Sequence, residues 1–488
     1  VSVLAGLAQN TGLKGVKFNT CSSETNATLA TAWTSMLQRN TSIKILDLRD
    51  SDYEENEDCE LCSAVAEGLV SNTTLETLYL PGMTDPEVFN GPVWQEALES
   101  NHCLKILSLA YCSITHEGFQ CLARGLSRNT SLCSLDLTGT GMTDVDLIAL
   151  VDELRTNKTL KCLDLSSNCG LSESGRAAIE LLIGYNVLRE LILANTEGSV
   201  GASILASGLS DNHSLEKLDL ETAFVDDEAS ETFLALCESL RGNTTLRYLD
   251  VRWNRVDFDS VCATALKLDT MSLETLNLDG ITVTSCGIAA LAQGLQGTCT
   301  LKELSLVGCR IDDTGLLYLG ETLITNDALE VLDVRNNNFT HDGVSQFFDL
   351  LPQMKSLEAV YGLVILSSDA PTEAVGMALV DGLRENTKLQ KIFADTDFGM
   401  TVDSTFSPDL AREINFYLGL NRRGRMLLQL SGRSEPPSGL WPRVLAKLSS
   451  PCDTSLLFYF LQNKPKIVKC KAAAKAAASQ KRKASNIS

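Results

Sequence analysis

The chain has 488 residues, a formal net charge of −21 and a hydrophobic content of 44%, enough apolar material for a long stacked core. A chain this acidic is a poor ligand for nucleic acid and is repelled by anionic membrane surfaces. No stretch approaches the roughly 18–20 consecutive apolar residues that a membrane span needs. We therefore expect neither nucleic acid nor a membrane as the partner.

The chain begins at Val1 instead of methionine, and its first ten residues have the pattern of the end of a repeat helix, with Leu4, Leu7 and Asn10. We expect the N-terminus to be truncated. A signal peptide, an upstream repeat or an effector domain would then lie outside this sequence.

The phrase Leu-x-x-Leu-x-Leu recurs along the chain, usually with Asn three residues before its first position. Successive first positions are 27 to 32 residues apart. They fall at Leu13, Ile43, Leu75, Leu104, Leu132, Leu160, Leu188, Leu215, Leu246, Leu273, Leu301, Leu329, Leu357 and Leu389. A period in this range predicts a solenoid, in which each repeat stacks only on its neighbours.

The repeat that starts at Leu104 predicts one strand and one helix. Leu104, Leu107 and Leu109 alternate as in a half-buried strand, and the apolar residues of 116–126 fall on one helix face. Thr115 is the expected N-cap, because its hydroxyl can accept a free backbone N–H of the first turn. The same position holds Thr143, Ser172, Asp312 and Thr340 in other repeats.

Two polar positions recur between the strands and the helices. Asn before each strand suits a tight helix-to-strand turn, because its side chain bonds nearby backbone groups. Three residues after the last strand leucine, a small polar side chain such as Asn168 or Asn254 can satisfy turn backbone that would otherwise be buried unpaired.

This pattern resembles the ribonuclease-inhibitor-like class of leucine-rich repeats, most closely in residues 104–115 and 301–312. The resemblance covers roughly residues 1–396. It implies an α/β leucine-rich-repeat solenoid, a horseshoe with inner parallel strands and outer helices. The class includes inhibitors, GTPase-activating proteins and the sensor halves of immune receptors, so the resemblance leaves the function open.

The sixteen cysteines are scattered, and many occupy repeat positions that hold Leu, Ser, Thr or Asn elsewhere. This favours buried free thiols and a reducing compartment over a disulfide framework. The Asn-x-Ser/Thr sequons favour secretion instead, because in a secreted protein they would be N-glycosylation sites. The asparagine that recurs in the turn before each strand explains these sequons equally well. The sequons occur at Asn26, Asn40, Asn72, Asn129, Asn157, Asn212, Asn243, Asn338 and Asn486.

The residue between the last two leucines of each phrase should point to the concave face, opposite the core. Six of the thirteen residues in this column from Asp47 to Phe393 are aspartates. We predict a partner-binding face that suits a basic protein, made by Asp136, Asp164, Asp219, Asp250, Arg252, Trp253, Asp333 and Arg335. The alternative is that Leu-Asp-Leu is commonplace in this class and that neighbouring Asp–Arg pairs only neutralise each other.

No pattern in the sequence predicts catalysis, a cofactor or a metal. A Gly-rich phosphate loop and a His-Glu-x-x-His helix are both missing from it. The acidic segment 50–60 lacks the turn glycine and final glutamate of a calcium loop, which favours a solvated loop. The single Cys-x-x-Cys, Cys59 to Cys62, has no second pair for zinc, so we expect simple packing.

The period stops after about residue 396. Residues 397–463 are rich in large apolar side chains and prolines, which predicts a mainly helical C-terminal cap over the last repeat; a small docking module is the alternative. Residues 464–488 carry eight Lys or Arg and no acid, and form a Lys/Ala-rich tail expected to be disordered. Within it, Lys481 to Lys483 resembles a nuclear-localisation cluster, although a merely solvated tail fits as well.

We therefore expect a binding scaffold and not an enzyme, placed in the cytoplasm or the nucleus, that binds a basic protein on its concave face. The alternatives are a GTPase-activating-protein-like regulator and the sensor half of a larger nucleotide-binding receptor. Neither the identity of the partner nor the oligomeric state follows from the sequence.

Overall fold

The computed structural model describes residues 1–18, 27–49, 59–80, 82, 85–168, 171–196, 208–225, 227–258, 271–296, 300–364, 372–394, 402–422 and 425. The chain divides into two compact units, Val1–Thr282 (unit 1) and Val283–Ser488 (unit 2). Each unit is built from the predicted strand–helix repeats, so the leucine-rich-repeat solenoid is confirmed.

Unit 1 contains a parallel sheet whose strands are neighbours in chain order. The strands are β1 (Gly15–Lys17), β2 (Ile45–Asp47), β3 (Thr77–Tyr79), β4 (Ile106–Ser108), β5 (Ser134–Asp136), β6 (Cys162–Asp164), β7 (Glu190–Ile192), β8 (Lys217–Asp219), β9 (Tyr248–Asp250) and β10 (Thr275–Asn277). Equivalent residues pair without a shift, as Leu107 does with Leu135 and Leu135 with Leu163.

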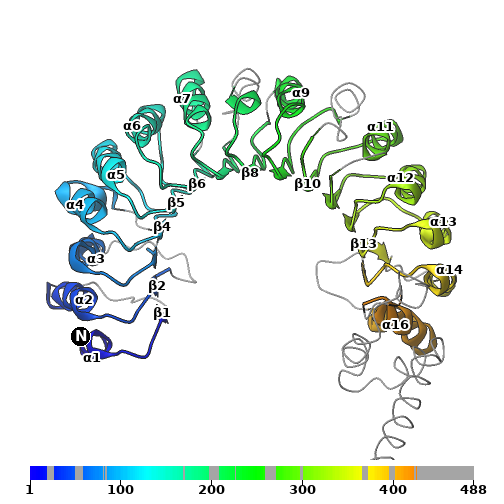
Figure 1. Ribbon diagram of the computed structural model, residues 1–488, viewed down its shortest axis with the longest axis horizontal. Coiled ribbons are helices and arrows are strands. Elements are labelled where there is room, and N and C mark those ends of the chain that lie inside the picture. The colour runs from blue at the N-terminus through cyan, green and yellow to red at the C-terminus, as the bar shows by residue number, and fades with distance from the viewer. Residues whose placement is uncertain are drawn as a thin grey trace, which may run out of the picture. The chain divides into compact units, whose positions relative to one another are not determined.

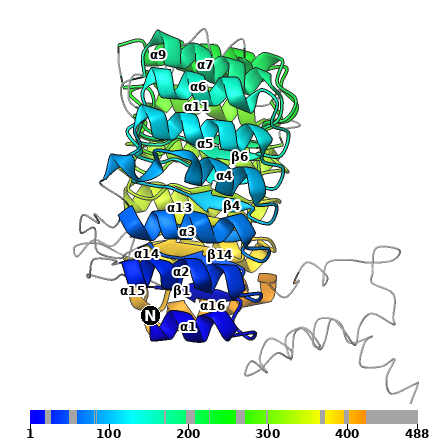
Figure 2. The same cartoon turned by 90° about the vertical axis from the view of Figure 1, so that its left-hand side faces the viewer.

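The helices of unit 1 cover one face of this sheet, and none of the described helices covers the other (Figure 1). They are α1 (Ser2–Gln9), α2 (Ala27–Arg39), α3 (Cys59–Ser71), α4 (Pro92–Ser100), α5 (His116–Arg128), α6 (Asp144–Leu154), α7 (Glu173–Gly184) and α9 (Ala229–Leu240), with the 3-10 helix η1 (Pro86–Phe89). Seen from the helix side, α1 to α7 lie one above another in chain order (Figure 2).

Unit 2 repeats the same plan. Its strands are β11 (Glu303–Ser305), β12 (Val331–Asp333), β13 (Ala359–Val364) and β14 (Lys391–Ala394). Its helices are α11 (Ser285–Leu295), α12 (Asp313–Thr325), α13 (His341–Leu350), η3 (Leu351–Gln353), α14 (Thr372–Glu385), α15 (Val402–Thr405) and α16 (Pro408–Arg422). Among the described residues of both units, no helix is long and apolar enough to cross a membrane.

The leucines of the phrase form the core between the sheet and the helices. Leu107, Leu135 and Leu163, the middle residues of three successive strands, are all buried. The predicted helix starts are confirmed as well. Thr115 accepts the backbone N–H of Gly118 at 3.1 Å, and Asp312 accepts that of Gly315 at 2.9 Å.

The recurring asparagine does more than shape its own turn. The Asn129 Oδ1 accepts the backbone N–H groups of Ser131 and Leu132 at 2.9 and 2.7 Å. Its Nδ2 donates to the carbonyls of Leu98 and Asn101 in the preceding coil at 2.6 and 3.2 Å. One buried side chain therefore satisfies two donors and two acceptors and joins adjacent coils.

This role explains the sequons whose asparagine nitrogen is buried and bonded to the preceding coil, namely Asn40, Asn72, Asn129, Asn157, Asn212 and Asn243. The interpretation as turn residues is confirmed for them. Asn338 is exposed, and Asn26 and Asn486 lie outside the described residues.

The second polar position also bridges coils, as predicted. Asn168 donates to the carbonyl of Leu137 in the preceding coil at 2.9 Å and accepts the N–H of Thr140 at 3.1 Å. The cysteines that take equivalent or core positions are free thiols, and Cys62, Cys112, Cys121, Cys237 and Cys309 are buried.

At the end of the described chain, α16 continues the polar ladder. Asn421 donates to the carbonyls of Asn386 and Leu389 at 3.2 and 2.8 Å, and buried Arg425 donates to that of Leu383 at 2.7 Å. These contacts fit a cap on the last repeat. The boundaries at 396 and 463 stay predictions. The acidic segment up to residue 58 and the basic tail with Lys481–Lys483 lie outside the described residues.

Candidate functional site

The candidate site is the sheet face that the helices leave open. From β2 to β12 each strand is three residues long, and its middle leucine faces the core. The first and third residues therefore point to the open face. The register aligns the third residues in one column, so that Asp136 pairs with Asp164 and Asp219 with Asp250.

The aspartates of this column have a local structural role that the sequence interpretation missed. Each accepts the backbone N–H of the residue two positions further on, which closes the turn after the strand. The distances are 3.0 Å for Asp136, 2.9 Å for Asp164, 3.1 Å for Asp219, 3.1 Å for Asp250 and 3.2 Å for Asp333. Asn277 does the same at 3.0 Å, so an amide suffices for this turn and the negative charge is not required by it.

Asp136 and Asp164 form the centre of an anionic patch. Hydroxyl groups surround both: Ser108 donates to Asp136 at 2.7 Å, as does Thr138, and Ser166 donates to Asp164 at 2.5 Å. Burial raises the pKa of Asp164, with the nearby Asp136 charge contributing in the same direction. The two carboxylates have hydroxyl neighbours here, in contrast to the arginine partners seen elsewhere in the column.

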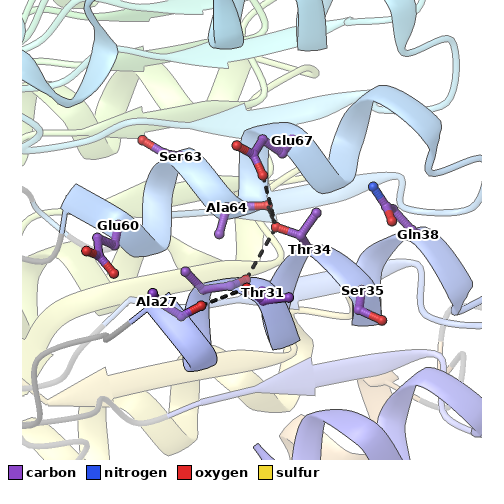
Figure 3. Close-up of a pocket in the computed structure, with 10 residues that line it drawn as sticks. Ala27, Thr31, Thr34, Ser35, Gln38, Glu60, Ser63, Ala64 and Glu67 are labelled. Atoms are coloured by element: carbon purple, nitrogen blue, oxygen red, sulfur yellow. Dashed lines mark hydrogen bonds between the residues drawn. The ribbon is translucent and has the colours of Figure 1, made fainter.

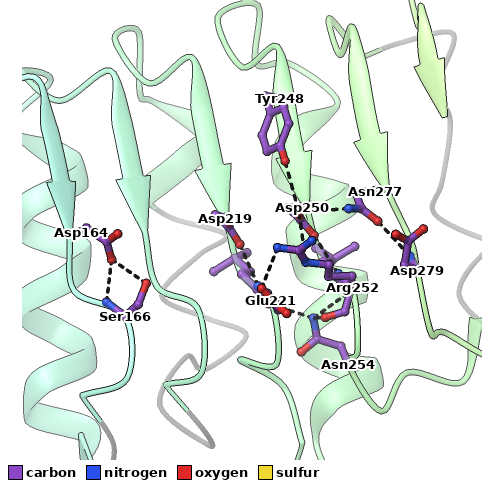
Figure 4. A network of polar contacts seen from close by, with 12 residues as sticks. Asp164, Ser166, Asp219, Glu221, Tyr248, Asp250, Arg252, Asn254, Asn277 and Asp279 are labelled. Carbon is purple, nitrogen blue, oxygen red and sulfur yellow. Dashed lines mark hydrogen bonds and ion pairs between the residues drawn. The ribbon is translucent and has the colours of Figure 1, made fainter. Parts of the chain in front are cut away.

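A denser network lies around Asp250 (Figure 4). Its carboxylate accepts the Tyr248 hydroxyl at 3.2 Å and the Asn277 amide at 3.1 Å, and lies 3.5 Å from the Arg252 Nε. The Arg252 Nη2 in turn donates to Glu221 at 2.8 Å. The network thus joins three neighbouring coils.

Burial raises the pKa values of the aspartates and of the tyrosine in this network. It raises the pKa of Asp250 to about 6, with the adjacent Asp219 charge adding to the shift and Arg252 opposing it. The pKa of Asp219 is also raised, by burial first. The phenol of Tyr248, desolvated and next to both carboxylates, has a raised pKa as well.

At Asp47 and Asp333 in the same column, an arginine two residues further on pairs with the aspartate and neutralises it. This is the arrangement that the alternative interpretation of the column described. The Asp47 side chain is bonded by Arg49 at 3.0 Å, a hydrogen bond that holds the Asp47 pKa below its ordinary value. In unit 2, Arg335 donates to Asp333 at 2.8 and 3.0 Å. This second pair therefore presents little net charge.

The predicted site residues thus fall into different groups. Asp136, Asp164 and Asp219 are partly exposed and carry uncompensated or weakly compensated charge, and Trp253 is 56% exposed. Asp250 has no exposed side-chain surface, so it supports Arg252 and is not itself a contact surface. Its expected role as a direct contact is corrected accordingly.

Two tyrosines were missed by the sequence interpretation. Tyr248 is the first residue of β9, in a column that alternation places on the open face, so the signal was present but unused. Tyr111 is 53% exposed in the turn after β4, at the position that Trp253 occupies after β9. Comparing the repeats at that position would have found it.

Away from the sheet face, a groove of about 520 Å³ lies between α2 and α3 (Figure 3). Small and polar side chains line it, and Thr34 at its centre donates to the carbonyl of Ala64 at 3.0 Å. Its two acids, Glu60 and Glu67, have no facing cation in the lining. In the described parts of the chain, no group of three or more His, Cys, Asp or Glu side chains is arranged to hold a metal ion.

Comparisons with known proteins agree with this architecture. The family model described as Leucine Rich repeat matches residues 100–123, 128–151, 156–179, 242–257 and 298–320. The ribonuclease inhibitor of Sus scrofa is 28% identical over 67% of this chain and 71% of its own length, and that of Mus musculus is 26% identical over 74% and 77%. The chain is thus built from leucine-rich repeats that are similar to those of ribonuclease inhibitors.

A further relative is NACHT, LRR and PYD domains-containing protein 5 of Homo sapiens, 28% identical over 58% of this chain. The match spans only 22% of that longer protein. Together the relatives and the repeat architecture support a protein-binding repeat scaffold, and they leave the partner open.

Proposed function

We propose that this scaffold binds a protein with a basic surface on its open sheet face, and that it is not an enzyme. The observation that carries the proposal is the register column of Asp136, Asp164 and Asp219, whose charge is not needed for the fold. An amide closes the equivalent turn at Asn277. Carboxylates without a structural need for charge, on the surface by which solenoids bind their partners, favour a cationic partner.

Arg252 and Trp253 flank this column in unit 1 and belong to the same proposed surface. Arg252 is held between Glu221 and Asp250 and keeps 36% of its side chain exposed, so it can offer donors to a partner without moving. In unit 2, Arg335 donates from Nε to Oδ1 and from Nη2 to Oδ2 of Asp333, so the two form a neutral, bidentate pair. They are proposed as a contact with weaker electrostatic attraction to a basic partner.

The test is affinity purification from the cells in which the protein is made, followed by mass spectrometry. The D136N/D164N/D219N variant removes three charges but keeps the carbonyl oxygen that accepts the turn N–H. The matched control is E96Q/E117Q/D152N, which removes three charges from exposed positions on α4, α5 and α6.

The proposal predicts that basic partners are lost with the first variant and kept with the second. It also predicts that raising the salt concentration weakens the wild-type complex, because exposed charges are screened beyond about 8–10 Å at physiological salt. Partners that remain bound to the first variant would overturn the proposed site.

The similarity to the NACHT, LRR and PYD protein favours a second candidate, in which these repeats are the sensor part of a larger nucleotide-binding receptor. Sequencing the full transcript decides it, since such a receptor carries a phosphate-binding loop in the same open reading frame. A transcript that encodes no such loop contradicts this candidate and leaves the first one standing.

A further inference from the structure

One position in the turn after each of the strands β4 to β10 has left-handed backbone. The position follows the phrase by two residues, and its φ angles lie between 52° and 71° at Tyr111, Gly139, Ser167, Asn195, Thr222, Trp253 and Gly280. The cause is a backbone hydrogen bond to the next coil, such as that from the Tyr111 N–H to the Thr138 carbonyl at 2.7 Å. The fold therefore imposes this conformation on whatever residue stands there.

Glycine and asparagine adopt left-handed backbone easily, whereas a bulky side chain there is strained. Tyr111 and Trp253 are the aromatic exceptions in unit 1, and the β-branched Thr222 is a third strained residue at this position. Their rings do not enter the core: 53% of Tyr111 and 56% of Trp253 is exposed. Strained residues persist where another requirement selects them, and here core packing is not that requirement.

Each ring lies on a glycine of the following coil. A Cβ atom placed on Gly139 would be 2.8 Å from the Tyr111 Cδ1, and one on Gly280 would clash with the Trp253 ring at Cε3. The glycines let each ring rest on backbone, with about half of each aromatic side chain open to solvent. The result is two fixed aromatic platforms on the same edge of the sheet.

The charge around both platforms is negative. Near Tyr111, the described residues 106–114, 134–142 and 162–168 contain Asp136 and Asp164 and no Lys or Arg. Near Trp253, residues 217–224, 248–254 and 275–281 contain four carboxylates and two cations, of which Arg252 is already bound by Glu221. A cation above an aromatic face gains from the ring quadrupole, and arginine also stacks on it with its planar guanidinium.

We propose that Tyr111 on Gly139 and Trp253 on Gly280 are docking platforms for arginine side chains of the basic partner. The inference rests on the proposed function and deepens it, since it names the contacts that the partner makes at the strand-end edge. β4 and β9 are five strand steps apart, about 24 Å at ~4.8 Å per step, which an extended peptide spans with about seven residues.

The probe is a 16-residue peptide of alternating Arg and Gly, long enough to reach both platforms. Its control is the same peptide with citrulline in place of arginine, which keeps the planar group but removes the charge. Binding is followed by the fluorescence anisotropy of the dye-labelled peptide, which needs no tryptophan in the protein, and Trp253 emission serves as a second readout in the wild type and in Y111N. The chain has four tryptophans, Trp33, Trp94, Trp253 and Trp441, so the Trp253 signal is taken as the difference in emission between wild type and W253N.

The proposal predicts that the arginine peptide alters the Trp253 emission and that the citrulline peptide binds several-fold more weakly. W253N and Y111N are each expected to weaken arginine-peptide binding by about fivefold, the equivalent of one cation–π contact, while W253F keeps most of the affinity. Because Asn suits left-handed backbone, both Asn variants should melt no earlier than the wild type.

Equal binding of the two peptides, or unchanged arginine-peptide binding by both Asn variants, would overturn the platforms. The outcome for the proposed function is separate, because that function depends on whether D136N/D164N/D219N loses the cellular partner. A chain that loses its partner in that variant but binds the peptide equally with and without the two rings keeps the proposed function and loses this inference.

Discussion

Replacing Asn129 by alanine tests the physical basis of the repeat. The Asn129 side chain makes four hydrogen bonds, two of them to the preceding coil, and it is 4% exposed. At roughly 1 kcal/mol net for each bond, and with buried partners left unpaired, N129A should lower the free energy of unfolding by about 3–4 kcal/mol. The expected loss is therefore a large fraction of the stability of an ordinary domain.

The assay is urea unfolding followed by far-ultraviolet circular dichroism, with N338A as the matched control. Asn338 is exposed, so removing its side chain should change the unfolding free energy by no more than about 0.5 kcal/mol. A loss below about 1 kcal/mol for N129A, or equal losses for the two variants, would refute the idea that this asparagine joins adjacent coils energetically.

Two further predictions concern charge. The folded-state pKa of Asp250, about 6, lies above its ordinary value of 3.8, so its contribution to stability is fully present below pH 4 and is lost as the pH rises through 6. Urea titrations at several pH values should show that the unfolding free energy of the wild type falls by about 2 kcal/mol relative to that of D250N between pH 4 and 7. An equal pH dependence of the two proteins would contradict the raised pKa of this buried carboxylate. Glu76 has a pKa lowered to about 2 by hydrogen bonds from Lys44 and Lys105, yet it is solvent-screened, so E76Q should leave the melting temperature unchanged. A clear drop in the melting temperature of E76Q would show that the exposed ion pairs of Glu76 with Lys44 and Lys105 stabilise the fold more than their exposure predicts.

Much of the fold follows from sequence periodicity. The strands, the helix starts at Thr115 and Asp312 and the turn asparagines are where the repeat predicts them, because each depends on local chemistry that recurs from coil to coil. Each coil also contacts only its neighbours, so local rules suffice for the whole solenoid.

The candidate site was harder to predict, because burial within it depends on the neighbouring coils. Asp136 and Asp250 hold the same position in the phrase, yet Asp250 is covered by Tyr248, Arg252 and Asn277 while Asp136 faces hydroxyl groups. The strained conformation of Tyr111 was likewise hidden, since a φ angle is not visible in a residue type. Only the alignment of repeats carries that information.

The most direct test of the central claim is a carboxylate footprint of the complex with the purified basic partner. Carbodiimide labelling is compared with and without partner and read by mass spectrometry at single residues. The account predicts protection of Asp136, Asp164 and Asp219, with unchanged labelling of Glu96, Glu117 and Asp152 on the helices. Protection of the helix carboxylates, with the sheet-face aspartates labelled as in the free protein, would contradict it.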